Sequence, residues 1–188
     1  MAESENSNGD FSRPIPQAAA AFAYAGALPF VVTAFLCWYP VDTFDAGSLA
    51  RTSVETMLGF SVVILSFMGG VRWGIAAGAA GGPRFSHLLV SIVPPAVAWL
   101  AMVLASDWMY SYAGWFDQFA PNLLDNWRHA AQLIMMIAAF WILLMSDRRL
   151  KDELPAWYLG WRVPWTVLVE LSLIAGLVRT IHLQVFAP

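Results

Sequence analysis

The stretch GFSVVILSFMGGVRWG, residues 59–74, carries one charged side chain, Arg72, in an otherwise apolar run of membrane-spanning length. Placing a guanidinium group inside a transmembrane helix costs roughly 2.5–3.5 kcal/mol on insertion scales. We therefore expect Arg72 to face protein or water rather than lipid. The segment WTVLVELSLIAGL, residues 165–177, carries a charge of opposite sign at a similar depth, Glu170. The two charges together predict a folded helical bundle.

The composition is that of an integral membrane protein. Of the 188 residues, 59% are hydrophobic and 12% are charged, and a soluble domain of this size could not cover its surface with so few charges. Several apolar runs of about 20 residues match a hydrocarbon layer roughly 30 Å thick. The net charge of −3 argues against a nucleic-acid-binding surface. We therefore expect the lipid bilayer to be a partner and expect no nucleic acid.

We predict an all-α fold, a bundle of about five transmembrane helices, because lipid cannot satisfy the hydrogen bonds of a non-helical backbone. The predicted spans are residues 17–39, 54–79, 88–105, 130–145 and 163–183 of one transmembrane domain that covers residues 17–188. Residues 1–16, which are acidic and contain proline, should form a flexible tail. Pro29 in the first helix and Pro94 and Pro95 in the third should kink those helices, since each proline removes a backbone donor.

One predicted connection, residues 106–129, is long and rich in aromatic residues. Trp and Tyr concentrate at membrane interfaces, so we expect this loop to lie at the outer headgroup level, with a partner-docking surface as the alternative. Tryptophans at the entry of the last helix should act as anchors in the same way. The tryptophans that we assign to the interface are Trp108, Trp115, Trp127, Trp157 and Trp161.

Basic residues are unevenly distributed between the two sides of the predicted bundle. Most lie in the N-terminal tail, in the loop after the second helix and in DRRLKDE, residues 147–153, which we interpret as a solvated turn. The positive-inside rule then places the N-terminus in the cytoplasm and the C-terminus outside. Because no Arg-rich transit peptide precedes the first helix, we expect the bacterial inner membrane, with the mitochondrial inner membrane as the alternative.

Small residues recur along one side of the second predicted helix. Gly59, Gly70 and Gly74 fall on one stripe, and Gly78 extends the small-xxx-small pattern. Because small residues let helix backbones approach closely, we expect this stripe to pack against a neighbouring helix. Arg72 lies nearly opposite the stripe at about 100° per residue, so protein should cover both sides. We therefore predict that this helix is the central one.

Arg72 and Glu170 should form an intramembrane charge pair. Each lies about seven residues from the cytoplasmic end of its predicted helix, which places both roughly 10 Å deep. Such a pair can be structural, can bind a ligand or substrate, or can relay protons. Relays usually need a chain of titratable groups, which this depth does not offer, so we favour the structural role. Thr166, one turn before Glu170 on the same face, could complete the network.

The sequence contains no recognisable catalytic or metal-binding motif. It has no nucleotide-binding loop, no G-x-S-x-G and no H-E-x-x-H, and its single cysteine, Cys37, excludes an internal disulfide. His129 and His182, on the same predicted side of the membrane, could hold a haem, but no attachment motif accompanies them. We therefore expect no enzymatic activity, no catalytic residue, no metal and no cofactor.

Four stretches occur together in the chain: ILSFMGGVRWG at 64–74, SIVPPAVAWLA at 91–101, DRRL at 147–150 and LPAWYLGWRVPWTVLVELSL at 154–173. The set resembles an uncharacterised family of small multi-helix membrane proteins, which has bacterial members and includes the mitochondrial transmembrane protein sixty-nine. The resemblance runs from about Gly26 to Gly176 and omits the tail and the long aromatic loop. It implies an integral inner-membrane protein of about five helices and carries no established activity.

These patterns favour a non-enzymatic integral inner-membrane protein, an accessory or assembly component of a larger membrane complex such as a respiratory one. Its partners would then be other integral membrane proteins. The alternative is a small transporter or binder of an apolar or tetrapyrrole-like ligand. Its pocket would lie near Arg72 and Glu170 and would be lined by Trp73, Trp99 and Thr166. An enzyme ranks third.

Overall fold

The computed structural model describes residues 16–39, 46–79, 81–104, 123–151 and 154–186. Within them the chain forms five helices and no strand: α1 (Gln17–Trp38), α2 (Ala46–Ala77), α3 (Phe85–Leu104), α5 (Leu123–Arg149) and α6 (Tyr158–Phe186). Each helix is long and apolar enough to cross a membrane. The predicted fold class is therefore confirmed. Residues 1–15 of the predicted tail, 1–16, lie outside the described residues, as do Trp108 and Trp115 of the predicted aromatic loop.

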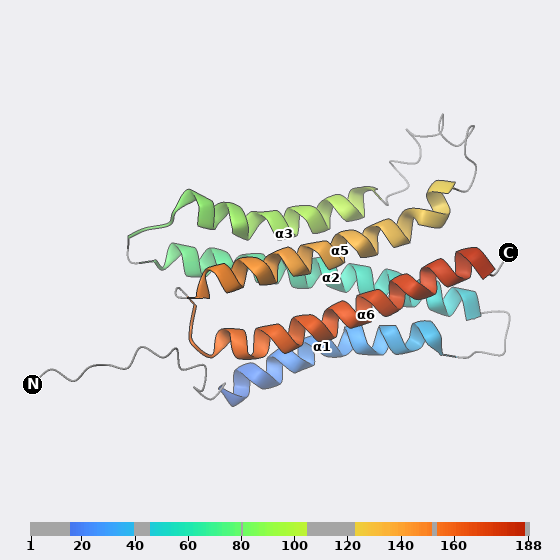
Figure 1. Cartoon of the computed structure of the whole chain (residues 1–188), viewed down its shortest axis with the longest axis horizontal. Coiled ribbons are helices and arrows are strands. Elements are labelled where there is room, and N and C mark those ends of the chain that lie inside the picture. The colour runs from blue at the N-terminus through green and yellow to red at the C-terminus, as the bar shows by residue number, and fades with distance from the viewer. Residues whose placement is uncertain (1–15, 40–45, 80, 105–122, 152–153, 187–188) are drawn as a thin grey trace, which may run out of the picture.

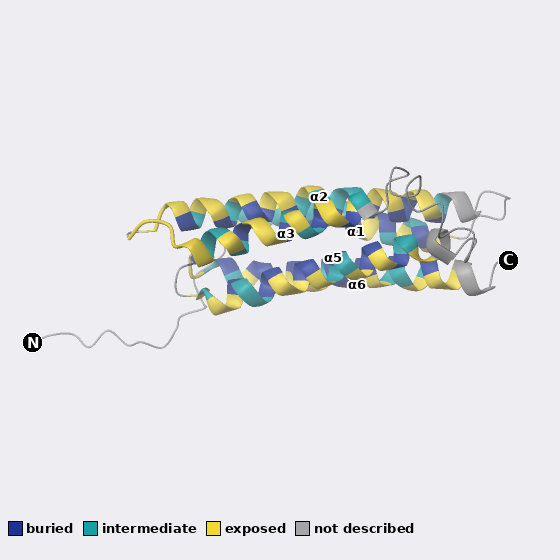
Figure 2. Ribbon diagram, turned by 90° about the horizontal axis from the view of Figure 1, so that it is seen from above, coloured by how far each residue is buried: buried dark blue, intermediate teal, exposed yellow. Residues whose placement is uncertain are grey.

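The helices run alongside one another and alternate in direction (Figure 1). We call the end where α1 begins the N-terminal end, and the end where α6 finishes the C-terminal end. Figure 2 separates α2 and α3 on one side from α5 and α6 on the other. Helix α1 closes the bundle by packing against both α2 and α6. Helix α2 contacts each of the other four helices, as expected of the central helix.

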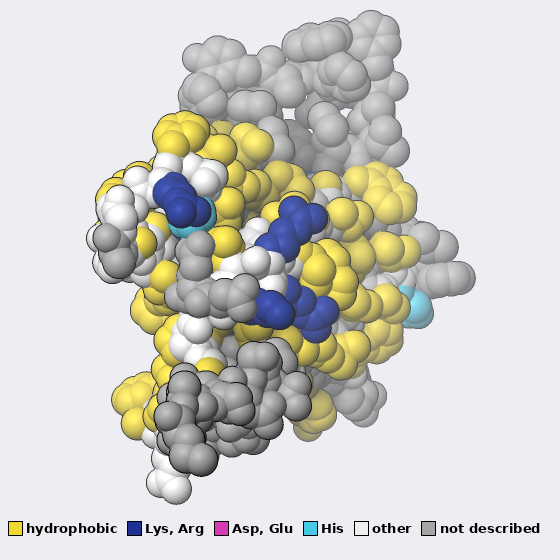
Figure 3. Space-filling model, turned by 60° about the vertical axis from the view of Figure 1, so that its left-hand side comes forward, with side chains coloured by type: hydrophobic (Ala, Val, Ile, Leu, Met, Phe, Trp, Pro, Cys, Tyr) yellow, Lys and Arg dark blue, Asp and Glu magenta, His cyan; other side chains and the backbone are white. Residues whose placement is uncertain are grey.

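Exposed basic side chains gather at the N-terminal end. Figure 3 turns this end toward the viewer and shows lysine and arginine, but no aspartate or glutamate, among the described residues of the visible face. Among the described residues, the exposed basic side chains at this end are those of Arg84, Arg148, Arg149 and Lys151. Basic residues favour the cytoplasmic side of a membrane, so this distribution is relevant to the orientation of the bundle in the membrane.

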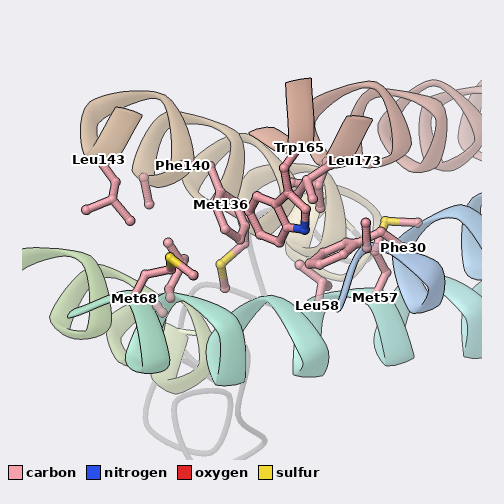
Figure 4. Close-up of a cluster of buried hydrophobic side chains, with 14 of the residues drawn as sticks. Phe30, Met57, Leu58, Met68, Met136, Phe140, Leu143, Trp165 and Leu173 are labelled. Atoms are coloured by element: carbon pink, nitrogen blue, oxygen red, sulfur yellow. The ribbon is translucent and has the colours of Figure 1, made fainter. Parts of the chain in front are cut away.

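Aromatic rings join four of the helices in the middle of the core. Phe30 of α1 lies edge-on to Phe60 of α2, Phe140 of α5 and Trp165 of α6, with ring centroids 5.2, 6.0 and 6.4 Å apart. Figure 4 shows Phe30, Phe140 and Trp165 among the buried apolar side chains. Edge-to-face pairs contribute about 0.5–1.5 kcal/mol beyond the area that they bury. In lipid, where burial itself gains little, this directional packing matters more.

The glycines predicted to pack against a neighbouring helix do not do so within the chain. A Cβ atom added to Gly59, Gly70 or Gly74 would meet nothing within 4 Å, and one at Gly78 would meet only carbonyls of its own helix. That prediction is wrong as an account of packing inside this bundle. Burial of Arg72 is the reason, because the stripe lies on the opposite side of α2 and must then face outward.

The close approach between α2 and α3 lies one residue away from the stripe, at Gly69. A Cβ atom there would come within 2.5 Å of the Ser91 carbonyl oxygen and 3.0 Å of Pro95 Cδ. Helices α1 and α3 continue through Pro29 and through Pro94 and Pro95. The kinks that we expect at these prolines stay a prediction.

Replacing Gly69 with alanine should lower the free energy of unfolding by about 1–3 kcal/mol, the usual cost of overpacking a tight contact. The matched change Gly70→Ala should leave it unchanged or raise it by up to about 1 kcal/mol, because alanine favours the helix and the added methyl meets open space. Denaturant unfolding in detergent, followed by circular dichroism, measures both. Equal effects at the two positions would contradict the assignment of Gly69 to the helix contact.

Candidate functional site

Three charged side chains from three helices meet inside the bundle near its N-terminal end. Asp147 of α5 accepts a hydrogen bond on Oδ2 from Nε of Arg162 of α6 at 3.0 Å. Its other oxygen, Oδ1, lies 3.2 Å from Nε of Arg72 of α2. The exposed fractions of Asp147, Arg162 and Arg72 are 0%, 0% and 5%. One carboxylate therefore bridges two guanidinium groups, and we call these three residues the charge cluster.

The helix lengths explain why these residues meet. Arg72 precedes the end of α2 at Ala77, Asp147 precedes the end of α5 at Arg149, and Arg162 follows the start of α6 at Tyr158. Each residue thus lies within about one and a half turns of the helix terminus at the N-terminal end of the bundle. The distance along the axis is roughly 3–8 Å at 1.5 Å per residue. The three side chains are therefore level.

An intramembrane ion pair is thus confirmed for Arg72, but the predicted partner, Glu170, is wrong. Glu170 lies two turns beyond Arg162, about 12 Å farther from the N-terminal end. We predicted the last helix from Val163, whereas α6 begins at Tyr158, and this difference places Glu170 deeper than expected. We also interpreted Asp147 as part of a solvated turn. Helix α5 instead runs on to Arg149 and carries Asp147 into the bundle.

The charge cluster holds two cations and one anion, and all three side chains are buried. Nη2 of Arg72 and both Nη atoms of Arg162 have no hydrogen-bond partner among the described residues. The Arg162 guanidinium carbon lies 5.2 Å from the ring centroid of Trp165, a cation–π contact that offsets part of the desolvation cost. Buried ion pairs rarely add net stability, since desolvation costs about as much as attraction returns. The cluster is better suited to fixing the helices in register.

Two further polar residues continue from the cluster along α6. Thr166 and Glu170 follow Arg162 at intervals of four residues, so the three share one face of the helix. Both side chains are buried, and Thr166 Oγ1 and Glu170 Oε1 have no hydrogen-bond partner in the described part of the chain. The structure therefore brings Thr166 and Glu170 onto the face of the cluster but does not join either to Arg72.

The predicted pocket near Arg72 and Glu170 does not form from the residues that we assigned to it. Trp73 and Trp99 are 48% and 64% exposed on the outer surface, whereas Arg72, Thr166 and Glu170 are buried. Trp73 lies about 100° around α2 from Arg72, and Trp99 lies on α3, so neither exposed ring shares the interior that holds the three buried side chains. The structure has instead a cavity of about 420 Å³ between α1, α2 and α6. Its aromatic lining residues are Phe22, Phe67, Trp157, Tyr158, Trp161 and Trp165.

The predicted interfacial tryptophans divide between surface and interior. Trp127, near the C-terminal end of the bundle, is about half exposed, and Trp157 is partly exposed. Trp161 is buried, and its ring lies 5.4 Å from Tyr158 and 6.3 Å from Trp165, centroid to centroid. Its predicted role as an interfacial anchor is wrong, because its side of α6 faces the interior of the bundle.

The C-terminal end carries separate polar contacts. His129 lies 3.6 Å from the Glu55 carboxylate, and His182 Nδ1 lies 3.4 Å from Nη1 of Arg179. Arg179 also donates from Nε to the Cys37 carbonyl oxygen at 3.0 Å, which ties α6 to the end of α1. The two histidines thus have different partners. No group of three or more potential metal ligands occurs among the described residues.

Sequence reasoning missed Asp147 and Arg162. A signal for Arg162 was present, because it stands in the apolar aromatic segment WYLGWRVPW, residues 157–165, as Arg72 stands in its own. The same rule that an arginine inside a span must find a partner applies to both. Asp147 had no such signal, because it opens the charged run DRRLKDE.

Replacing Asp147 with asparagine should lower the free energy of unfolding by about 3–5 kcal/mol, because two buried guanidinium groups lose their counter-charge. Glu170→Gln makes the same chemical change at a buried carboxyl that has no ion-pair partner, and it should cost no more than about 1 kcal/mol. Denaturant unfolding of the two variants in detergent measures the difference. A loss at Glu170 as large as that at Asp147 would count against the cluster as described.

The comparisons with known proteins agree with this architecture. A family model described as "Protein of unknown function (DUF3429)" matches residues 15–178. The chain is 29% identical over 172 residues to Transmembrane protein 69 of Xenopus tropicalis, covering 88% of this chain and 55% of that protein. The chain thus spans about half the length of this curated relative. No solved structure matches. The chain belongs to the DUF3429 family, a family of unknown function in which we had placed it by resemblance.

Proposed function

We propose that the protein is a non-enzymatic accessory or assembly component of a larger membrane complex, which it joins through the outward face of α2. That face is the stripe formed by Gly59, Val63, Ser66, Gly70 and Gly74. All of these residues except Gly59, which is partly buried, are exposed. The proposal concerns a membrane protein whose five helices are long enough to span the bilayer.

The observation that carries this proposal is the open space around the glycines. A Cβ atom at Gly59, Gly70 or Gly74 would meet nothing within 4 Å, so packing inside this chain does not require glycine at these positions. Each glycine in a helix costs about 1 kcal/mol relative to alanine. Small residues on a membrane helix allow a second helix to approach closely, which would repay that cost. A helix of another protein is the occupant that suits this face.

The edges of the stripe support the same conclusion. Phe67 and Trp73 are about half exposed or more, and at 100° per residue they lie roughly 60° to either side of Gly70. Two large aromatic side chains thus flank a row of small residues. Such an arrangement allows close approach at the centre and van der Waals contact at the sides, which together drive helix association in lipid.

The interior supports a structural rather than a chemical role. The charge cluster uses its carboxylate to connect three helices, and Trp165 Nε1 donates to the Ala23 carbonyl oxygen at 2.8 Å, which connects α6 to α1. These contacts hold the bundle in one arrangement. A rigid bundle with an unpartnered helix face is suited to be a component of an assembly.

We also propose an orientation and a membrane. The exposed basic residues of the N-terminal end favour the cytoplasmic side under the positive-inside rule, so the C-terminal end would face outward. The bacterial inner membrane is the location that we propose, with the mitochondrial inner membrane as the alternative. A reporter fused to each terminus would determine the orientation.

Replacing Gly70 with leucine should abolish association with the partner, because the larger side chain fills the centre of the stripe. The expected loss of partner is at least about tenfold after purification in mild detergent, since close packing cannot be recovered. Gly26→Leu is the matched control. Gly26 also has open space around it, but it lies on α1 and outside the stripe of α2, so this variant should retain the partner.

Partner association would be measured by cross-linking in the native membrane before extraction. The attached proteins would then be identified for each variant. Retention of the same proteins by the Gly70→Leu variant, or recovery of monomer alone from the unaltered chain, would contradict the proposed role.

A further inference from the structure

One face of α6 is polar from the charge cluster to the middle of the helix. Arg162, Thr166 and Glu170 follow one another at intervals of four residues, and all three side chains are buried. Both Nη atoms of Arg162, Oγ1 of Thr166 and Oε1 of Glu170 lack a hydrogen-bond partner among the described residues. Buried polar groups in proteins nearly always have a partner, either protein or ordered water. This face therefore has hydrogen-bonding capacity that the protein itself does not use.

Thr166 differs from three other buried hydroxyls of α2 and α6. A serine or threonine inside a helix usually donates back to the carbonyl four residues earlier. Ser61, Ser172 and Thr180 do so, at 2.8, 2.9 and 2.9 Å, to the carbonyl oxygens of Met57, Leu168 and Gly176. Thr166 makes no such bond. Its hydroxyl is free to donate to one group and accept from another.

The spacing along this face suits single water molecules. Four residues of α-helix advance about 6 Å along the axis. A water molecule that bridges two side chains through two hydrogen bonds of about 2.8 Å spans nearly the same distance. One water between Arg162 and Thr166, and another between Thr166 and Glu170, would satisfy the unpartnered atoms.

The polar face ends at Glu170. The residues that continue it toward the C-terminal end, Leu173, Ile174 and Leu177, are apolar. Ser172 and Thr180, the buried hydroxyls of α6 beyond Glu170, are already bonded to their own helix. Along α6, polar side chains thus connect Glu170 to the N-terminal end, and an apolar segment follows it toward the C-terminal end.

On α6 the charged residues nearest Glu170 are Arg162, eight residues before it, and Arg179, nine residues after it, about 12 and 14 Å away along the axis. Arg162 and Tyr158 precede it on α6, and Arg72 of α2 and Asp147 of α5 meet at the cluster about 12 Å away. Helix α1 carries no charged residue, and its titratable groups are the surface Tyr24 and, at the other end, Cys37. The remaining titratable groups of α2 and α5 that could face α6 lie at the C-terminal end and are Arg51, Glu55, Arg128 and His129. No described residue forms an ion pair with Glu170.

We propose that Glu170 is a proton-binding site in the membrane interior, which water reaches from the N-terminal end only, through Thr166 and the charge cluster. Binding forms one O–H bond on a Glu170 oxygen, and the proton comes from bulk water at that end along the bridging waters. A proton is the ligand that suits this carboxyl, because an ionised carboxylate without a cation beside it is costly in an apolar layer. This inference does not depend on the outward face of α2.

Infrared spectroscopy of the protein in lipid vesicles tests the proposal, because a protonated carboxyl absorbs apart from an ionised one and shifts on transfer to D₂O. The unaltered chain should show a carboxyl band that Glu170→Gln removes. Thr166→Val, which keeps the side-chain volume, should slow exchange of this band roughly tenfold, the effect of losing one hydrogen-bonded step. Thr180→Val, the same change at a hydroxyl on the other side of Glu170, should leave the rate unchanged.

Three results would overturn the proposal: no band sensitive to Glu170→Gln, a band that does not exchange while the protein remains folded, or slowing by Thr180→Val and not by Thr166→Val. Circular dichroism checks that each variant is folded. If Thr166→Val does not fold, Thr166→Ala takes its place. Thr166→Ser, which keeps the hydroxyl, should exchange at the rate of the unaltered chain, and a slow serine variant would also count against the proposal.

Discussion

A buried charge inside a membrane protein needs a counter-charge, and in this bundle Asp147 is the one carboxylate paired with two arginines. Its oxygens lie 3.2 Å from Nε of Arg72 and 3.0 Å from Nε of Arg162. Moving either arginine out of contact with Asp147 would leave that guanidinium without a counter-charge in the apolar interior, a cost of several kcal/mol. The axial positions of α2, α5 and α6 are therefore coupled at one level near the N-terminal end. The aromatic contacts around Phe30 then hold α1 against the same three helices.

The outward face of α2 follows from the same constraint. A helix that turns Arg72 toward Asp147 must turn the opposite stripe, which includes Gly59, Gly70 and Gly74, away from the bundle. The chain uses Gly69 for the close contact between α2 and α3 and leaves the stripe uncovered. The residues that fix the bundle and the residues that we propose for partner binding are thus on opposite sides of one helix.

The sequence predicted the helices and their number well, because apolar runs of membrane length leave the backbone little choice. It also predicted that Arg72 would be buried in an ion pair, since lipid cannot accommodate a guanidinium. It could not identify Asp147, because hydropathy does not show where a helix ends within a charged run such as DRRLKDE. The start of α6 at Tyr158 was missed for the same reason, and this error made Glu170 look level with Arg72. The stripe of small residues indicated helix packing but not which chain supplies the second helix.

A double-mutant cycle between Arg72 and Asp147 tests the central claim most directly. The free energies of unfolding of Arg72→Gln, Asp147→Asn and the double variant would be measured in the same detergent, beside a parallel cycle of Arg72→Gln with Glu170→Gln. Residues in contact usually show coupling of about 0.5–3 kcal/mol, whereas independent sites add within about 0.5 kcal/mol. We expect coupling of at least about 1 kcal/mol for Arg72 with Asp147 and additivity for Arg72 with Glu170. The reverse result would show that Asp147 does not hold the bundle together.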